Sequence, residues 1–154
     1  MFLADIRFCT EENLSQVLEL DQFSPHPWPE RVIAGDLRGG RVSYLGAFAA
    51  EGQLLGYAAL GEERGGALLM NLLVSPDRRR LGLGLQLVVA AAEFAADMGF
   101  SLLSLRVRSS NTAALALYKT LGFRVRATQQ HFYSNGDPAR YMLARLPLSL
   151  RALQ

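Results

Sequence analysis

The chain has 154 residues, half of them hydrophobic, and a formal net charge of +2. This length suits one ordinary domain with a sizeable core, so we expect a single domain over residues 1–147, a short tail at 148–154 and no second domain. The basic residues are scattered except at 78–80. A nucleic-acid partner is therefore not expected.

Cysteine content and apolar run length indicate the compartment. The single cysteine, Cys9, cannot form an internal disulfide and is expected to be a small buried hydrophobe. Asp5 and Arg7 interrupt the N-terminal apolar stretch before a signal peptide forms, and no run approaches the roughly 18 apolar residues of a membrane span. We expect a cytoplasmic protein without a membrane partner.

The first half of the chain predicts a strand, two short helices and three meandering strands. Thr10 is a plausible N-cap for the first helix, and prolines between residues 23 and 29 make a shaped loop before the second. The other predicted ranges, in chain order, are a strand at 4–9, a helix at about 29–37, and strands at 42–49, 53–60 and 66–75.

The second half predicts helices and strands in alternation. Apolar residues spaced by three and four mark a helix at 84–98 that ends at Gly99. A leucine-rich strand at 101–107 precedes a second helix, which Asn111 caps and which ends at Leu121. Two final strands are predicted at 123–133 and 139–146. The whole order predicts an α/β (α+β) fold with a mixed sheet.

Residues 79–84, Arg-Arg-Leu-Gly-Leu-Gly, lie between a predicted strand and the start of a predicted helix. A helix N-terminus has backbone N–H groups without intrahelical partners and a partial positive charge, so it favours a bound anion. The same spacing also fits a tight turn without a ligand.

Three blocks in the right order resemble the GNAT acyltransferase superfamily. They are residues 74–77 followed by the glycine turn at 79–84, then 109–111, then 117–123. Within the superfamily the chain is most similar to the RimI-type ribosomal-protein N-terminal alanine acetyltransferases. The residues that carry this similarity are Pro27, Trp28, Asn71, Phe132, Tyr133, Gly136 and Met142.

The resemblance implies a mixed, mostly antiparallel seven-stranded sheet with about four helices, splayed between the strands at 66–75 and 101–107. It also implies acetyl-CoA as co-substrate. The residues implied to bind it are Leu72, Leu73, Val74, Arg79, Arg80, Leu81, Gly82, Leu83, Gly84 and Asn111. Asn111 has the alternative of a plain helix N-cap, and the two roles use different atoms.

Tyr118 is the candidate general acid. A phenol with a pKa of about 10 is protonated at neutral pH and can give a proton to a departing thiolate whose thiol has a pKa of about 8.5. Periodicity alone favours a different interpretation, an aromatic ring on the core face of its helix. The motif match supports the catalytic role.

Arg106 stands where the RimI-type family has a glutamate, and an arginine cannot accept a proton. A free α-amine is roughly 10 to 15% neutral at pH 7 and a lysine only about 0.04%, so losing the base penalises a lysine acceptor more. We expect an α-amine acceptor, deprotonated through water or by Glu62, Glu63 or Asp137. Two alternatives are that Arg106 binds an anionic group of a small amine, and that it pairs with a nearby acid.

The sequence therefore predicts an acetyl-CoA-dependent N-acetyltransferase that acts by direct ternary-complex transfer on a protein or peptide N-terminus. A small-amine acetyltransferase and an inactive CoA-binding sensor are the alternatives. Tyr133 is implied to line the acceptor channel. Neither His26 nor His131 has a cysteine or acid at ligand spacing, so no metal is expected. The apolar tail at 148–153 either packs on a second subunit, giving a homodimer, or frays.

Overall fold

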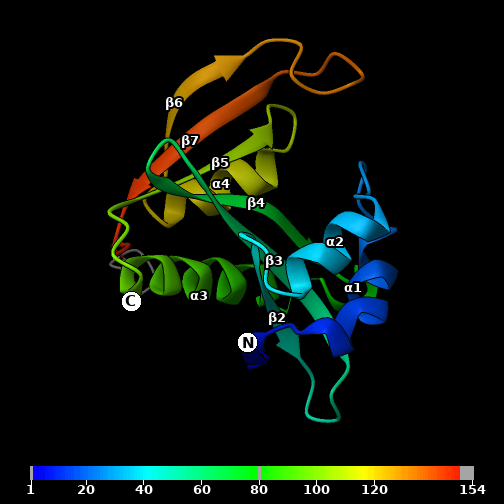
Figure 1. Ribbon diagram of the computed structural model, residues 1–154. Coiled ribbons are helices and arrows are strands. Elements are labelled where there is room, and N and C mark those ends of the chain that lie inside the picture. Colours follow the sequence, from blue (N-terminus) through cyan, green and yellow to red (C-terminus); the bar gives the residue numbers. More distant parts are fainter. Residues whose placement is uncertain (1, 80, 150–154) are drawn as a thin grey trace. The chain divides into compact units, whose positions relative to one another are not determined.

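A computed structural model describes residues 2–79 and 81–149 of the chain (Figure 1). Its strands are β1 (Asp5–Phe8), β2 (Ser43–Phe48), β3 (Leu54–Glu63), β4 (Gly66–Val74), β5 (Leu102–Arg108), β6 (Arg124–Gln129) and β7 (Ala139–Arg145). Its helices are the 3-10 turns η1 (Glu11–Asn13) and η2 (Pro76–Arg78) and the α-helices α1 (Leu14–Asp21), α2 (Glu30–Leu37), α3 (Leu83–Asp97) and α4 (Thr112–Thr120).

The seven strands form one sheet in the order β1-β2-β3-β4-β5-β7-β6. β4 and β5 are parallel, whereas β1 with β2, β2 with β3, β5 with β7 and β6 with β7 are antiparallel. Within the described residues there are four α-helices. The predicted α/β fold with a mixed, mostly antiparallel seven-stranded sheet is confirmed.

The chain divides into two compact units. Unit 1 comprises Met1–Glu62 and Met70–Ala91, and unit 2 comprises Glu63–Leu69 and Ala92–Gln154. The division passes through β4, whose first four residues belong to unit 2 and whose remainder belongs to unit 1. The single domain expected over residues 1–147 stays a prediction.

Unit 1 has a core between its strands and the helices α1 and α2. Val17 of α1 and Ile33 of α2 are fully buried, and both pack in one cluster with Tyr44 of β2 and Tyr57 of β3. The rings of Tyr44 and Tyr57 stack with their centroids 5.5 Å apart. Trp28, half-buried in the loop before α2, packs against this cluster and anchors that loop to the core.

A buried carboxylate ties three parts of unit 1 together. Asp21, at the end of α1, is only 2% exposed. Its Oδ1 accepts a hydrogen bond of 2.8 Å from the Tyr57 hydroxyl, and its Oδ2 accepts one of 2.8 Å from the Trp28 backbone N–H. The Asn71 side-chain amide of β4 donates to the Tyr57 hydroxyl at 2.9 Å. Asn71 therefore connects the middle of β4 to α1 through Tyr57.

We expect Asp21→Ala to lower the free energy of unfolding by about 3 kcal/mol, because it leaves two buried donors without an acceptor. At this chain length the loss corresponds to a fall in Tm of roughly 6 to 12 °C. Urea unfolding measures it, with Asp36→Ala as the matched control, since within the described residues the Asp36 carboxylate accepts one hydrogen bond, from the Tyr44 hydroxyl at 3.0 Å. Equal losses in the two variants would show that the second hydrogen bond of Asp21 contributes nothing.

Unit 2 is built around β5. It pairs with β7 over its whole length and runs parallel to the start of β4, where Ala67–Leu69 face Leu103–Leu105. Alternate β5 residues Leu103, Leu105 and Val107 are buried. The predicted splay of β4 and β5 stays a prediction.

Two predicted strand boundaries were wrong. β3 continues to Glu63 beyond the predicted end at residue 60, because the turn is made by Arg64 and Gly65, which have φ values of 52° and 80°. β6 ends at Gln129 and not at 133, because His131 takes a φ of 53° and the chain turns away into the long loop that joins β6 to β7 (Figure 1).

The longest helix in the described ranges is α3, with 15 residues, which is too short to cross a membrane.

Candidate active site

The predicted anion cradle lies in unit 1 between β4 and α3. The chain leaves β4 at Val74, makes the 3-10 turn η2, and passes through Arg79 in an extended conformation. Gly82 then takes a φ of 80°, which side-chain-bearing residues rarely adopt, and α3 begins at Leu83. The glycine thus turns the chain into the helix N-terminus. Arg80 lies outside the described residues.

The carbonyl groups of this segment take part in hydrogen bonds with other parts of the chain. The carbonyl oxygens of Leu81 and Gly82 accept hydrogen bonds from the backbone N–H groups of Phe2, at 3.3 Å, and Gln86, at 3.1 Å. The N–H groups of Leu81 to Gly84 lie just before and at the start of α3, where a helix leaves its N–H groups without intrahelical partners. The buried Nε of Arg78 also has no hydrogen-bond partner among the residues that the structure describes. These donors fit an anion such as the pyrophosphate of acetyl-CoA.

The end of β4 is the second predicted contact with the co-substrate. Leu73 is buried, whereas Leu72 and Val74 are half-buried. Gly56 of β3 lies so close that an added Cβ would be 2.8 Å from the Leu73 carbonyl oxygen. This close approach explains the glycine and fixes the backbone of Leu73. The predicted contacts of residues 72–74 with acetyl-CoA stay predictions.

Asn111 precedes α4 as its N-cap, and Tyr118 lies within α4; both are in unit 2. The Asn111 side chain accepts a hydrogen bond of 3.1 Å from the Ala114 backbone N–H, which confirms the predicted N-cap. Tyr118 is 7% exposed, and its ring meets that of Phe123 edge-on at 5.7 Å. Burial, with a smaller contribution from Tyr133, raises the pKa of Tyr118 to about 12. Tyr118 therefore lies on the core face of α4, and its phenol keeps its proton.

Arg106 of β5 is held by a carboxylate. Its Nη1 and Nη2 donate to the two carboxylate oxygens of Glu63 at 3.1 and 2.9 Å, and its Nε donates to Oε1 of Gln129 at 2.9 Å. The guanidinium carbon also lies 5.5 Å from the ring centroid of Phe132 and 5.2 Å from that of Tyr141. The structure thus shows the alternative in which Arg106 pairs with a nearby acid.

The charge of Arg106 acts on the acidity of its partner. The hydrogen bonds from Arg106 lower the pKa of Glu63, and burial opposes this effect only in part. The two side chains are 19% and 27% exposed, so solvent screens the pair incompletely. Glu63 is therefore a weak base.

We expect Glu63→Gln to destabilise unit 2 in a pH-dependent way. The folded-state pKa of Glu63 is lowered, so its contribution to stability is present above the unfolded-state pKa near 4.3 and is lost as the pH falls through the folded-state value. The Tm difference between wild type and Glu63→Gln should be larger at pH 7 than at pH 4. A difference that is constant or grows on acidification would contradict the ion pair.

A second arginine pair lies beside the first. Arg108 Nη1 donates to Asp137 Oδ2 at 3.0 Å and to Asn135 Oδ1 at 3.1 Å, and its guanidinium carbon lies 3.9 Å from the ring centroid of Tyr133. The Tyr133 and Phe132 rings meet edge-on at 5.0 Å. Of the three acids considered as bases, Glu63 and Asp137 are thus both bound to arginines, and Glu62 is exposed.

The sequence indicates Arg106, Tyr133 and Glu63 separately. It does not show that these three residues form one cluster with Gln129 and Tyr141. The register of the β5 and β7 ladder, which places Arg106 opposite Tyr141, is the signal that finds Tyr141. Within residues 2–79 and 81–149 no group of three or more histidine, cysteine or acidic side chains is arranged to hold a metal ion.

Several known proteins are similar to this chain in sequence. The [Ribosomal protein bS18]-alanine N-acetyltransferase of Escherichia coli K12 is 32% identical over 126 residues, covering 80% of this chain and 83% of that protein. The Mycothiol acetyltransferase of Clavibacter sepedonicus is 38% identical over 110 residues, covering 66% of this chain but 36% of that protein.

Solved structures agree. The crystal structure of the ribosomal-protein-S18-alanine N-acetyltransferase from Escherichia coli superposes with a TM-score of 0.83 at 28% identity, covering 94% of this chain and 95% of the other. Ard1 from Thermoplasma volcanium gives a TM-score of 0.81 at 21% identity, over 94% and 98% of the two chains, which is a likeness of fold. The model of the Acetyltransferase (GNAT) family matches residues 8–123. The chain is a member of the GNAT family of acetyltransferases.

Proposed function

We propose that this acetyltransferase transfers the acetyl group of acetyl-CoA to the N-terminal α-amine of a protein or peptide. The observation that carries the proposal is the two-pronged ion pair between Arg106 and Glu63. In this pair the Glu63 carboxylate balances the positive charge of Arg106, and the pKa of Glu63 is lowered. Similarity to the Escherichia coli bS18-alanine N-acetyltransferase supports the same acceptor class.

The acceptor must suit a site without a strong base. The lowered pKa of Glu63 makes it a poor acceptor for a proton from a lysine ammonium, whose pKa is about 10.4. An α-ammonium, with a pKa of about 7.8, releases its proton to water readily at neutral pH. The charge state of the cluster therefore favours α-amines over lysine side chains.

In the proposed reaction the neutral nitrogen attacks the thioester carbonyl carbon directly. The C–N bond forms, the C–S bond breaks, and the proton of the amine leaves to water. The amides at residues 79–84 hold the pyrophosphate, Asn111 contacts the pantetheine arm, and a backbone N–H near Leu73 or Val74 polarises the carbonyl oxygen. Tyr133 lines the acceptor channel.

Tyr118 stabilises the departing sulfur. With a pKa of about 12, its phenol is less acidic than a CoA thiol of about 8.5, so complete proton transfer to the thiolate is uphill by about 5 kcal/mol. A hydrogen bond from the phenol to the developing thiolate carries no such cost. Tyr118 therefore acts as a hydrogen-bond donor to the departing thiolate, and the thiolate takes its proton from water after it leaves.

One alternative acceptor has an observation in its favour. Three of the five N–H donors of Arg106 are engaged by Glu63 and Gln129, which leaves two for an anionic group on a small amine. Similarity to the Mycothiol acetyltransferase of Clavibacter sepedonicus is compatible with a small acceptor. The alternative of an inactive sensor loses support, because the relatives are named as acetyltransferases.

CoA release in the presence of two acceptor sets distinguishes these alternatives. One set contains short peptides with an N-terminal alanine and an amidated C-terminus, and the other contains small amino acids with a free carboxylate. We expect kcat/KM to be larger for the peptides, and Arg106→Gln to change it little for them. A preference for the carboxylated amines that disappears in Arg106→Gln would overturn the proposal.

A further inference from the structure

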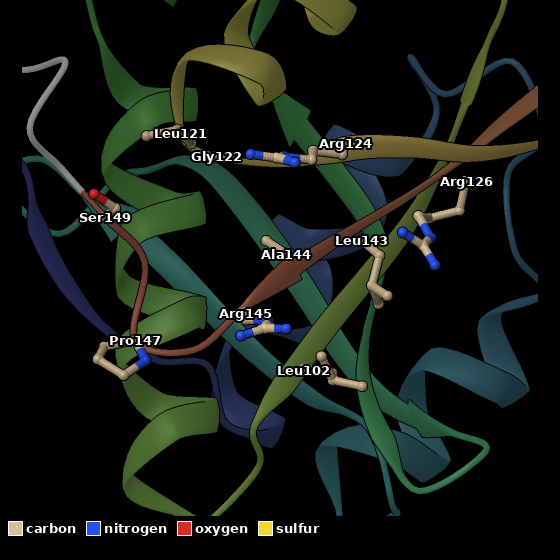
Figure 2. A pocket seen from close by; sticks show the side chains of 10 residues that line it. All are labelled: Leu102, Leu121, Gly122, Arg124, Arg126, Leu143, Ala144, Arg145, Pro147 and Ser149. Atoms are coloured by element: carbon tan, nitrogen blue, oxygen red, sulfur yellow. The ribbon is translucent and has the colours of Figure 1, made fainter.

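Unit 2 carries a groove formed by the start of β5, the start of β6 and the end of β7. It encloses about 530 Å³ (Figure 2). Its lining residues are Leu102, Leu121, Gly122, Arg124, Arg126, Leu143, Ala144, Arg145, Pro147 and Ser149. None of these residues has a part in the reaction proposed above. The volume is in the range of pockets that hold a small ligand or a short peptide segment.

The charge of the groove is entirely positive. Its lining includes Arg124 and Arg126 of β6 and Arg145 of β7, all three exposed, and no acidic residue. No carboxylate in residues 2–79 or 81–149 forms an ion pair with any of the three. Figure 2 shows their guanidinium groups at three separate places, with the Leu143 side chain among them.

Apolar side chains alternate with these charges. In the strand register Arg145 is opposite Leu102, and Arg124 is opposite Leu143. Leu102 is 38% exposed, although it is a large hydrophobic residue. β6 is the edge strand of the sheet, and five of its six residues are exposed. The groove thus offers alternating cationic and apolar positions beside an open strand edge.

We propose that this groove binds an extended acidic segment of another protein, with carboxylates on Arg124, Arg126 and Arg145 and apolar side chains between them on Leu102 and Leu143. An extended chain places alternate side chains on one face about 6 to 7 Å apart, so its carboxylates can reach successive cationic positions. The register of β6 shifts between Val125 and Ala127, so the spacing of Arg124 and Arg126 departs from that of a regular strand. The lining contains no aromatic ring on which a nucleic-acid base would stack, so a peptide fits better than a single-stranded nucleic acid.

Fluorescence anisotropy with N-terminally blocked, labelled peptides tests the proposal. The blocked peptide of alternating glutamate and leucine is the probe, and the same peptide with glutamine for glutamate is its neutral control. We expect the acidic peptide to bind at least about tenfold more tightly, and the difference to shrink as the salt concentration rises. A single-stranded oligonucleotide of equal charge is measured in parallel.

Substitutions of the groove arginines test whether the acidic peptide binds in the groove. Arg124→Gln, Arg126→Gln and Arg145→Gln should each weaken binding roughly threefold, and the triple variant at least about tenfold. Arg140→Gln on the same strand β7 is the matched control, since Arg140 bonds to Thr128 and does not line the groove. CoA release from acetyl-CoA and Tm should be unchanged in all four groove variants, which separates this proposal from the acetyltransferase reaction.

Three results would overturn the proposal. The first is equal binding of the acidic and neutral peptides. The second is equal weakening by Arg140→Gln and by the triple variant, and the third is tighter binding of the oligonucleotide than of the acidic peptide.

Discussion

Replacing Tyr118 with phenylalanine is expected to lower kcat by roughly 10²- to 10⁴-fold, the range for loss of a positioned acid or hydrogen-bond donor. The KM for acetyl-CoA should change little, because the hydroxyl acts on sulfur only as the C–S bond breaks. Within the described residues no hydrogen-bond partner of this hydroxyl is recorded, so its removal should also leave Tm nearly unchanged. Steady-state rates of CoA release measure the effect.

Tyr44→Phe is the matched control for a buried tyrosine. Its hydroxyl donates to Asp36 in unit 1, so its loss should lower Tm and leave kcat unchanged. The pKa of Tyr118, about 12, also predicts that wild-type kcat does not fall between pH 8 and pH 10 through ionisation of this phenol. A Tyr118→Phe variant with a wild-type kcat would remove Tyr118 from the mechanism.

Replacing Gly82 with valine is expected to raise the KM for acetyl-CoA roughly 100-fold. Gly82 has a φ of 80°, which a β-branched residue avoids, so the turn must change its conformation and move the neighbouring amides. Losing two hydrogen bonds to a charged pyrophosphate costs about 3 kcal/mol or more, which corresponds to this change in affinity. Titration of CoA binding by calorimetry measures it directly.

Gly52→Val separates cradle damage from general backbone strain. Gly52, in the turn between β2 and β3 of the same unit, has a φ of 96° and no atom within 4 Å of an added Cβ. The Gly52→Val variant should lose stability as Gly82→Val does, but it should bind CoA with wild-type affinity. Equal CoA affinity in the two variants would show that the turn at 79–84 does not hold the co-substrate.

The element order was predictable because local signals are strong in this chain. Asn111 and the helical apolar spacing before Gly99 located α4 and α3 to within one or two residues, since caps and periodicity depend on near neighbours. The ends of β3 and β6 were not predictable. They depend on Arg64 and His131 adopting positive φ. Histidine is found there more often than most residues, but the conformation is uncommon for every residue with a side chain, so residue type alone does not locate it.

The site was predictable where it follows a motif and not where it depends on pairing across the sheet. The glycine turn and Tyr118 follow from contiguous motifs. The partner of Arg106, Glu63, lies 43 positions away on another strand. The sequence therefore indicates Glu63 only as one of three candidate bases. Gln129, which also bonds to Arg106, is not indicated by the sequence. Only the strand register, which pairs it with Ala139 on β7, places it there.

The most direct test of the proposed acceptor is a competition within one molecule. A peptide with a free N-terminal alanine and one internal lysine is incubated with the enzyme and acetyl-CoA, and tandem mass spectrometry locates the acetyl group. We predict that early product carries it on the α-amine, and that Tyr118→Phe slows this product without changing its site. Acetylation of the lysine at an equal or greater rate would contradict the proposed acceptor.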